Sequence, residues 1–184
     1  MISTIESISK KHAEQLYSKY SSYVYRIALF LTKSKSLAED VTQETFIQVF
    51  KKYHMYDLNR PFEPWIYKIT INTCRNMYRK SKWLSFIGHP QEQESNDLID
   101  ETFFKEQEKI ELWEEINKLS QKSREVIVLH FYLDMKLNEV STVLNIPLGT
   151  CKSRLNTALT SLRKNFKDSN KIHIIKGGKY DEAI

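Results

Sequence analysis

The sequence predicts an all-α protein made of two small helical domains that are joined by a flexible acidic linker. Apolar residues recur at three- and four-residue intervals along most of the chain, which is the spacing of a buried helical face. Glycine and proline number only four each among 184 residues, too few for the many turns of a β-sandwich. Charge is also segregated: residues 1–83 carry net +7, residues 84–110 net −5 and residues 111–184 net +3.

Composition excludes several classes of protein. A mass of 21.9 kDa allows one ordinary domain or two small ones. The two cysteines, Cys74 and Cys151, lie far apart and outside any CxxC motif, so neither a zinc module nor a disulfide framework is predicted. The chain lacks a run of about 18 apolar residues and a signal-peptide pattern at Met1. We therefore expect a cytoplasmic protein without cofactor or metal.

Two long helices open the first domain. The predicted buried stripe of the first consists of Leu16, Tyr20, Val24, Ile27 and Leu31. After a loop over 32–36, Ser36 and Glu39 have the spacing of a capping box that would start the second helix. Its expected core face consists of Ala38, Val41, Phe46, Val49 and Tyr53.

The opposite face of the second helix is polar with one exception. It carries Asp40, Gln43, Glu44, Ile47 and Lys51. An apolar side chain among acids and amides is either an isolated surface residue, which is the commoner case, or the anchor of a partner-binding patch.

The third helix is expected to begin near Pro61–Pro64 and to end near Lys82, with a core face formed by Trp65, Ile66, Ile69, Thr73 and Met77. One edge of it is basic and contains no acid. The residues of this edge are spaced at four, three, four and three, so they share one stripe: Lys68, Asn72, Arg75, Arg79 and Lys82. Like charges stacked in this way repel each other without an anionic partner, which favours nucleic-acid contact over a solvated surface.

The second domain ends in a short helix, a tight turn and a longer helix. Val140, Val143 and Leu144 mark the short helix, Asn145 suits a left-handed helix end, and Pro147 suits a first helical position. The predicted buried stripe of the last helix is Cys151, Leu155, Ala158, Leu159, Leu162 and Phe166. Its outer face is polar and basic. This order is that of a DNA-binding helix-turn-helix, although helical hairpins in ordinary bundles have a similar pattern.

Together these motifs resemble the extracytoplasmic-function (ECF) sigma factors of bacterial RNA polymerase. The resemblance rests on Ala38-Glu-Asp-Val-Thr-Gln-Glu-Thr-Phe46, on Trp65-Ile-Tyr-Lys-Ile69 with Asn72 and Arg75–Lys80, and on Ile146-Pro-Leu-Gly-Thr-Cys-Lys-Ser-Arg-Leu155. It implies sigma region 2 at residues 1–84, a linker at 85–108, region 4 at 109–168 and a tail at 169–184.

The resemblance also implies roles for individual residues. Contacts with the clamp helices of the largest polymerase subunit fall to Asp40, Gln43, Glu44, Phe46 and Ile47, and region 4 would meet the polymerase flap. Contacts with the −10 element fall to Phe62, Trp65, Tyr67, Lys68, Asn72, Arg75, Arg79 and Lys82, with a base of the melted non-template strand held by the loop at about Tyr56–Glu63. Contacts with duplex DNA at −35 fall to Thr150, Lys152, Ser153, Arg154 and Asn156.

The implied protein is an alternative sigma factor without an active site, which directs promoter-specific initiation in an envelope or stress response. The family is commonly held inactive by an anti-sigma factor, often anchored in the membrane, so the resemblance implies such a partner too. Four positions depart from the family pattern: Lys136 replaces a Ser or Thr cap, Ser141 an Ala, Thr157 an Arg and Asn76 an Asp. The loss of a basic side chain at Thr157 affects the expected promoter preference rather than the fold.

Two other functions fit parts of the sequence. A stand-alone helix-turn-helix regulator would explain the second domain but not the mixed face around Ile47. A metal-dependent nuclease or phosphotransferase would use Glu39, Asp40 and Glu44, but Glu39 points away from the other two and no histidine joins them.

Overall fold

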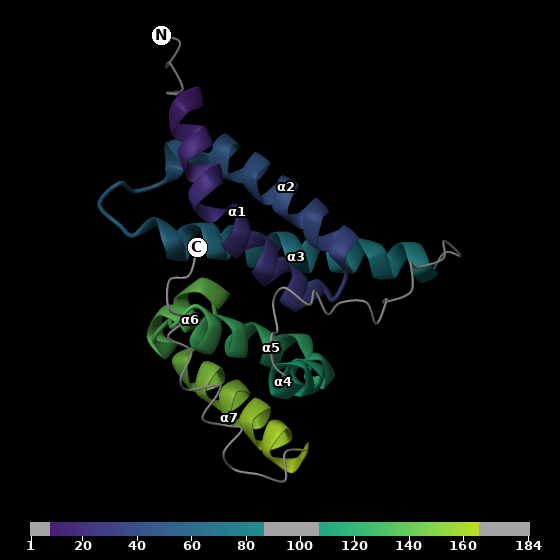
Figure 1. The fold of residues 1–184 in the computed structure, drawn as a ribbon. Helices are drawn as coiled ribbons and strands as arrows, with labels where there is room; N and C mark the ends of the chain where they lie inside the picture. Colours follow the sequence, from purple (N-terminus) through teal and green to yellow (C-terminus); the bar gives the residue numbers. More distant parts are fainter. Residues whose placement is uncertain (1–7, 87–106, 166–184) are drawn as a thin grey trace. The chain divides into compact units, whose positions relative to one another are not determined.

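The computed structural model describes residues 8–86 and 107–165, and every regular element in these ranges is a helix (Figure 1). The chain divides into two compact units, Met1–Leu98 and Ile99–Ile184. The predicted all-α fold with two helical domains is confirmed. Most of the predicted linker and the predicted tail, together with Phe166, lie outside the described residues. Among the described helices, none has the length and apolar character needed to cross a membrane.

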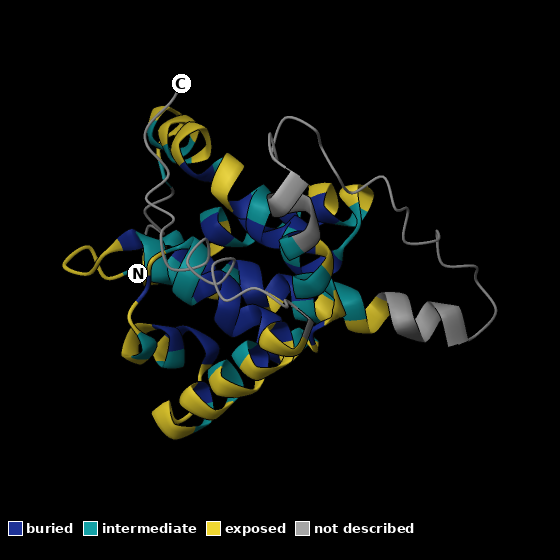
Figure 2. Cartoon of the chain, turned by 60° about the horizontal axis from the view of Figure 1, so that its bottom comes forward, coloured by how far each residue is buried: buried dark blue, intermediate teal, exposed yellow. Residues whose placement is uncertain are grey.

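The first unit is a bundle of three long helices. These are α1 (Lys10–Thr32), α2 (Lys35–Lys52) and α3 (Phe62–Phe86), with a 3₁₀ turn, η1 (Tyr53–Met55), between the last two. Each of the three helices packs against the other two. Most of the predicted stripes of α1 and α2 are buried, and the fully buried residues include Val24, Ile27, Ala38, Val41 and Val49. The predicted core face of α3 was only partly right: Ile66 and Thr73 are buried, whereas Trp65, Ile69 and Met77 are half-buried and Ile71 and Cys74 are buried instead. The reason is that α3 packs against both α1 and α2, which cover a wider face than a single stripe. Figure 2 shows the buried residues on the faces that the helices turn toward one another.

The start of α2 differs from the predicted capping box. Lys33 adopts a left-handed conformation with φ 59°, and its N–H bonds to the Leu29 carbonyl, so α1 ends there. Ser34 then caps α2, since its hydroxyl accepts a hydrogen bond from the Leu37 N–H at 3.2 Å. The connection is therefore shorter than the predicted loop, and Ser36 lies inside the helix. The predicted capping box at Ser36 and Glu39 was wrong. The left-handed turn at Lys33 places the N-cap two residues earlier, at Ser34.

The second unit is built around its last helix. It contains α4 (Gln107–Lys118), α5 (Gln121–Ile127), a π-helical turn η3 (Val128–Tyr132), α6 (Leu137–Leu144) and α7 (Leu148–Asn165). Helix α7 packs against α4, α5 and α6. The core cluster comprises the buried Leu119, Ile127, Ala158 and Leu162, with Leu112, Ile116, Phe131, Leu155 and Leu159 packed around them. This agrees with the predicted stripe of the final helix within the described residues.

Helix ends in the second unit are satisfied by features that spacing does not predict. Ser120 caps α5 by accepting a hydrogen bond from the Ser123 N–H at 3.2 Å. The buried Arg124 turns back, and its Nη2 donates to the Leu119 carbonyl at 2.9 Å, next to the end of α4. A guanidinium placed there satisfies a carbonyl that the helix leaves without a partner.

Candidate nucleic-acid and polymerase interfaces

Helix α2 presents a mixed polar and apolar surface, here called the α2 patch: Asp40, Gln43, Glu44 and Ile47. Asp40 and Gln43 are exposed, and the apolar Ile47 is 44% exposed on the same face. Glu44 is half-buried, and its Oε1 accepts a hydrogen bond from Gln48 Nε2 at 2.7 Å. The patch therefore combines carboxylates and an amide around one apolar centre.

Phe46, which the sequence placed with the patch, lies beneath it. The side chain is only 3% exposed, and its ring centroid lies 4.7 Å from that of Tyr17 and 5.8 Å from that of Phe50. In this conformation Phe46 therefore fixes α2 against α1 rather than offering its ring to a partner. Tyr17, which the spacing argument left out, is 49% exposed beside it.

Helix α3 carries the basic stripe that its spacing predicts, here called the α3 stripe: Lys68, Asn72, Arg75 and Arg79. Lys68, Asn72 and Arg79 are exposed and Arg75 is half-buried. Arg79 Nη2 donates to Asn76 Oδ1 at 2.5 Å and its Nε to the Arg75 carbonyl at 3.3 Å. Because Asn76 is neutral, these bonds orient the guanidinium without cancelling its charge. The side chain of Lys82 lies outside the described ones.

An aromatic cluster of Tyr53, Tyr56, Phe62 and Trp65 joins η1 to the start of α3. Phe62 is at its centre, with ring centroids 5.2 Å from Tyr56, 5.4 Å from Trp65 and 6.5 Å from Tyr53. Tyr56 and Trp65 also face each other at 5.1 Å. Phe62 is 9% exposed, whereas Tyr56 and Trp65 are half-buried, so the latter two offer the accessible ring surface. Tyr67 is 7% exposed and belongs to the core.

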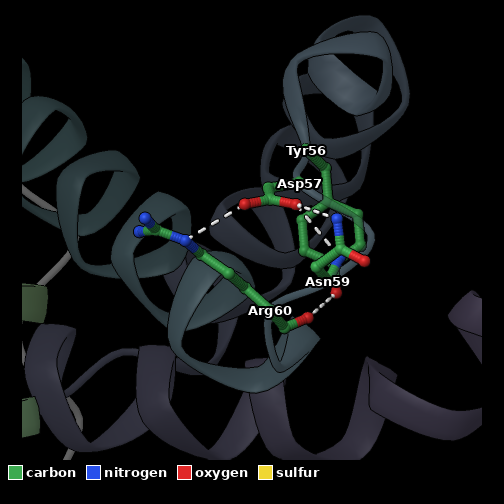
Figure 3. Close-up of polar contacts among 4 residues, drawn as sticks. All are labelled: Tyr56, Asp57, Asn59 and Arg60. Carbon is green, nitrogen blue, oxygen red and sulfur yellow. Dashed lines mark hydrogen bonds and ion pairs between the residues drawn. The ribbon is translucent and has the colours of Figure 1, made fainter.

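The loop of residues 56–61 is held by its own side chains (Figure 3). Asp57 Oδ1 accepts hydrogen bonds from Asn59 N at 3.0 Å and Asn59 Nδ2 at 3.2 Å, while Asp57 Oδ2 lies 3.2 Å from Arg60 Nε. The Tyr56 hydroxyl donates to the Arg60 carbonyl. Met55 and Leu58 project from this region, 69% and 74% exposed. The loop is therefore pre-formed next to accessible aromatic rings.

Helices α6 and α7 form the helix-turn-helix. Asn145 ends α6 in the left-handed conformation with φ 53°, as the sequence predicts. Pro147 precedes α7, and its carbonyl accepts the first bond, from Cys151 N at 3.0 Å. Lys136 provides no side-chain cap to α6, although Glu139 Oε2 accepts from the Lys136 N–H at 2.7 Å. Half of a capping box therefore replaces the expected Ser or Thr.

The outer face of α7, here called the α7 surface, consists of Thr150, Lys152, Ser153, Arg154 and Asn156. Lys152, Ser153 and Asn156 are exposed, and Thr150 and Arg154 are half-buried. The Ser153 hydroxyl donates to the Thr150 carbonyl at 3.0 Å. A side chain added at Gly149 would meet nothing within 4 Å. The start of α7 is therefore open, and α7 (Leu148–Asn165) contains no acidic and no aromatic residue.

Carboxylates do not gather into a metal site in the described part of the chain. No group of three or more His, Cys, Asp or Glu residues there could hold a metal ion. The trio required by a metal-dependent nuclease, Glu39, Asp40 and Glu44, is thus not assembled.

Both units of the chain match known proteins of one family. Residues 16–84 match the model of Sigma-70 region 2, and residues 109–162 match that of Sigma-70 region 4. The chain is 29% identical over 160 residues to the ECF RNA polymerase sigma factor SigW of Bacillus subtilis, covering 81% of this chain and 86% of that protein. It is 30% identical over 158 residues to SigM of the same organism, covering 82% and 92%.

A solved structure supports the same fold. The sigma factor RpoE of Bartonella quintana, in complex with the anti-sigma factor NepR, aligns with a TM-score of 0.68 at 20% identity, covering 85% of this chain and 97% of that one. Sigma factors are transcription initiation factors and not enzymes, which agrees with the expected lack of an active site. Both sigma regions are matched, and the relatives are similar to this chain over most of their own length. The chain therefore belongs to the ECF RNA polymerase sigma factors, and it is an alternative sigma factor.

Proposed function

We propose that this sigma factor uses three separate surfaces: the α2 patch for core RNA polymerase, the α3 stripe with its neighbouring loop for the −10 element, and the α7 surface for the −35 element. The observation that carries the proposal is the α3 stripe, a basic edge on the same helical bundle as the mixed α2 patch. A DNA-binding regulator without polymerase has no use for both surfaces in one unit.

The α2 patch has the composition of a protein-binding hot spot. Ile47 is 44% exposed, and the polar Asp40, Gln43 and Glu44 lie three to seven positions before it, on the same face of α2. A buried apolar anchor with a polar rim is a common arrangement in protein interfaces. We assign this patch to the clamp helices of the largest polymerase subunit, and region 4 to the flap.

The −10 surface suits a melted strand. Lys68, Arg75 and Arg79 provide charge for the phosphates, and the half-buried rings of Tyr56 and Trp65 provide faces on which an unstacked base can lie. The hydrogen bonds of Asp57 keep the loop of residues 56–61 formed before DNA arrives. Less conformational entropy is then lost when a base of the non-template strand enters.

The α7 surface suits an intact duplex. It lies on the second helix of a helix-turn-helix, which is the element that enters a major groove. Lys152 and Asn156 are long enough to reach base edges or phosphates from its exposed face. The neutral Thr157 at a position where the family has Arg leaves one fewer cation on this face.

The partners and location follow from the family. The Bartonella relative is bound to an anti-sigma factor, and we extend such regulation, including a membrane-anchored form, to this chain. A factor that acts with RNA polymerase works in the cytoplasm, and an envelope or stress response is the setting in which this class operates.

The test is start-site mapping with purified bacterial core polymerase, with and without the protein, on fragments of the source genome. Discrete new start sites that share paired upstream elements are the expected result. The Ile47→Asp variant should abolish them, while Met55→Ala, another exposed apolar change, should leave core binding intact. If the protein shifts duplex DNA but neither binds core nor changes initiation, the stand-alone regulator is the better account.

A further inference from the structure

A polar contact links the first helix of the bundle to the start of the −10 surface. The Tyr20 hydroxyl on α1 donates a hydrogen bond of 2.7 Å to Glu63 Oε1, which lies in the first turn of α3. Lys19 Nζ lies 3.8 Å from the same oxygen and 4.9 Å from the centroid of the Tyr20 ring. Two residues that are 43 positions apart are thereby joined.

The electrostatics favour a charged acceptor at this contact. Partial burial by itself raises the pKa of Glu63. The hydrogen bond from Tyr20, a hydrogen bond from the backbone and the nearby Lys19 together outweigh this effect, so the pKa lies below its usual value. Burial raises the pKa of Tyr20, which therefore keeps its proton to donate. A carboxylate in the first turn also interacts favourably with the helix dipole.

Tyr20 also contacts the aromatic cluster. The Tyr20 ring lies 5.0 Å from that of Phe62, the residue that contacts Tyr56 and Trp65. Tyr56 in turn donates to the Arg60 carbonyl and so fixes one side of the loop. A continuous series of contacts thus runs from α1, through Phe62, to the loop of residues 56–61.

Other contacts also hold α1 against α3. Apolar residues of α1 and α3 that are fully buried, such as Val24, Ile27, Ile66 and Ile71, already provide the packing between the helices. Tyr20 is 4% exposed, so its own ring is not available to DNA. Its position beside the aromatic cluster indicates an effect on the geometry of the loop.

We propose that Tyr20 and Glu63 are a positioning pair for promoter reading: their hydrogen bond fixes the first turn of α3, and thereby sets the loop that receives a −10 base. The proposal rests on the −10 assignment of the preceding subsection. Neither residue contacts the base. Their effect is expected in how well the holoenzyme distinguishes one −10 base from another.

The experiment is a double-mutant cycle in the holoenzyme assembled from core polymerase and the full chain. Tyr20→Phe, Glu63→Ala and the double variant are compared on two promoters that differ in one −10 base, with permanganate reactivity as the measure of strand opening. Each single variant should lower the ratio of opening on the two promoters about threefold to tenfold, the range expected for the net contribution of one ordinary hydrogen bond. The double variant should lose no more than a single one.

Controls separate positioning from stability. Tyr23→Phe, an exposed tyrosine on the same helix, and Glu14→Gln should leave the ratio unchanged. Glu63→Gln should retain most of the discrimination, because an amide oxygen still accepts from Tyr20. Core affinity should stay within the range of the controls. Any loss of stability caused by the missing hydrogen bond should lower opening equally on the two promoters, so it leaves their ratio unchanged.

Each other outcome contradicts a definite claim. If the wild type discriminates and the variants match it, or if their losses are equal on both promoters and add in the double variant, the positioning pair is wrong. If the wild-type holoenzyme opens neither promoter, the −10 assignment fails and the pair's role fails with it.

Discussion

The two candidate DNA surfaces, the α3 stripe and the α7 surface, both carry positive charge, but different side chains and backbone structures lie next to that charge. Beside the α3 stripe lie aromatic rings and a loop with internal hydrogen bonds, with Tyr56 and Trp65 only partly covered. The α7 surface has no aromatic residue and lies on a regular helix whose first turn contains Gly149, where a side chain would meet no other atom within 4 Å. Stacking faces suit bases that have left the duplex, whereas a smooth helix suits a groove. The positive charge of each surface indicates that it binds nucleic acid. The side chains beside the charge indicate whether that nucleic acid is a melted strand or an intact duplex.

The largest expected effect comes from removing charge from the α3 stripe. The double variant Lys68→Gln, Arg79→Gln should lower strand opening by more than about tenfold at 0.2 M salt. Its log–log salt slope should also become shallower by about 0.7 for each lost contact with a single strand. The control is Lys10→Gln, Lys11→Gln, two exposed cations at the start of α1. An unchanged salt slope for the α3 variant would contradict phosphate contact by this stripe.

A change in the α7 surface should act only on promoters with a −35 element. The Asn156→Ala variant should weaken holoenzyme binding to such promoters by about tenfold, corresponding to the loss of one base contact. Binding to a template that lacks the −35 element should not change. Footprinting on paired templates provides the measurement, and Thr160→Ala, on the same helix, is the matched control. Equal losses on both templates would argue against base reading by α7.

Stability of the second unit should increase when the cap of α6 is restored. Lys136 makes no side-chain cap, and only the Glu139 half of a capping box is present. Lys136→Ser should therefore raise the free energy of unfolding by about 1 kcal/mol. Urea unfolding followed by circular dichroism measures this change. A loss of stability would show that Lys136 supports α6 in another way.

The smallest expected effect is on the pH dependence of stability, and it concerns Glu63 at the start of α3. The folded-state pKa of Glu63 is lower than its usual value, so its contribution to stability is present above the ordinary carboxyl pKa. That contribution is lost as the pH falls through the folded-state pKa. Stability of the wild type should therefore fall more steeply with acid than that of Glu63→Gln. Parallel acid profiles of the two proteins, by urea unfolding, would contradict this linkage.

How much of this could be predicted from the sequence depends on the kind of information. Local periodicity was sufficient for the helices, for the core stripes of α1 and α7, for the left-handed end at Asn145 and for the exposed, basic edge of α3. It failed at Ser36, because the left-handed Lys33 moved the cap to Ser34. A spacing rule describes a face of a helix but not which turn conformation precedes it.

The burial of aromatic side chains and the contacts between residues far apart in the sequence could be seen only in the folded structure. Phe46, Phe62 and Tyr67 were placed with the interfaces, and all three are buried, because periodicity cannot tell how far a neighbouring helix covers an aromatic ring. The hydrogen bond between Tyr20 and Glu63 joins two helices, and no local pattern marks it. The helical spacing also left out the exposed Tyr17, because its contact with Phe46 is between helices.

The most direct test of the central claim measures both surfaces on DNA in two states. Holoenzymes with the Lys68→Gln, Arg79→Gln variant or the Asn156→Ala variant would be bound to one promoter as a full duplex and with its −10 region already unpaired. We predict that the α3 variant binds poorly even to the unpaired template, while the Asn156→Ala variant shows the same defect on both as long as the −35 duplex is present. If pre-melting rescued the α3 variant completely, the α3 stripe would not bind the melted strand, and the contrast between the two surfaces would be wrong.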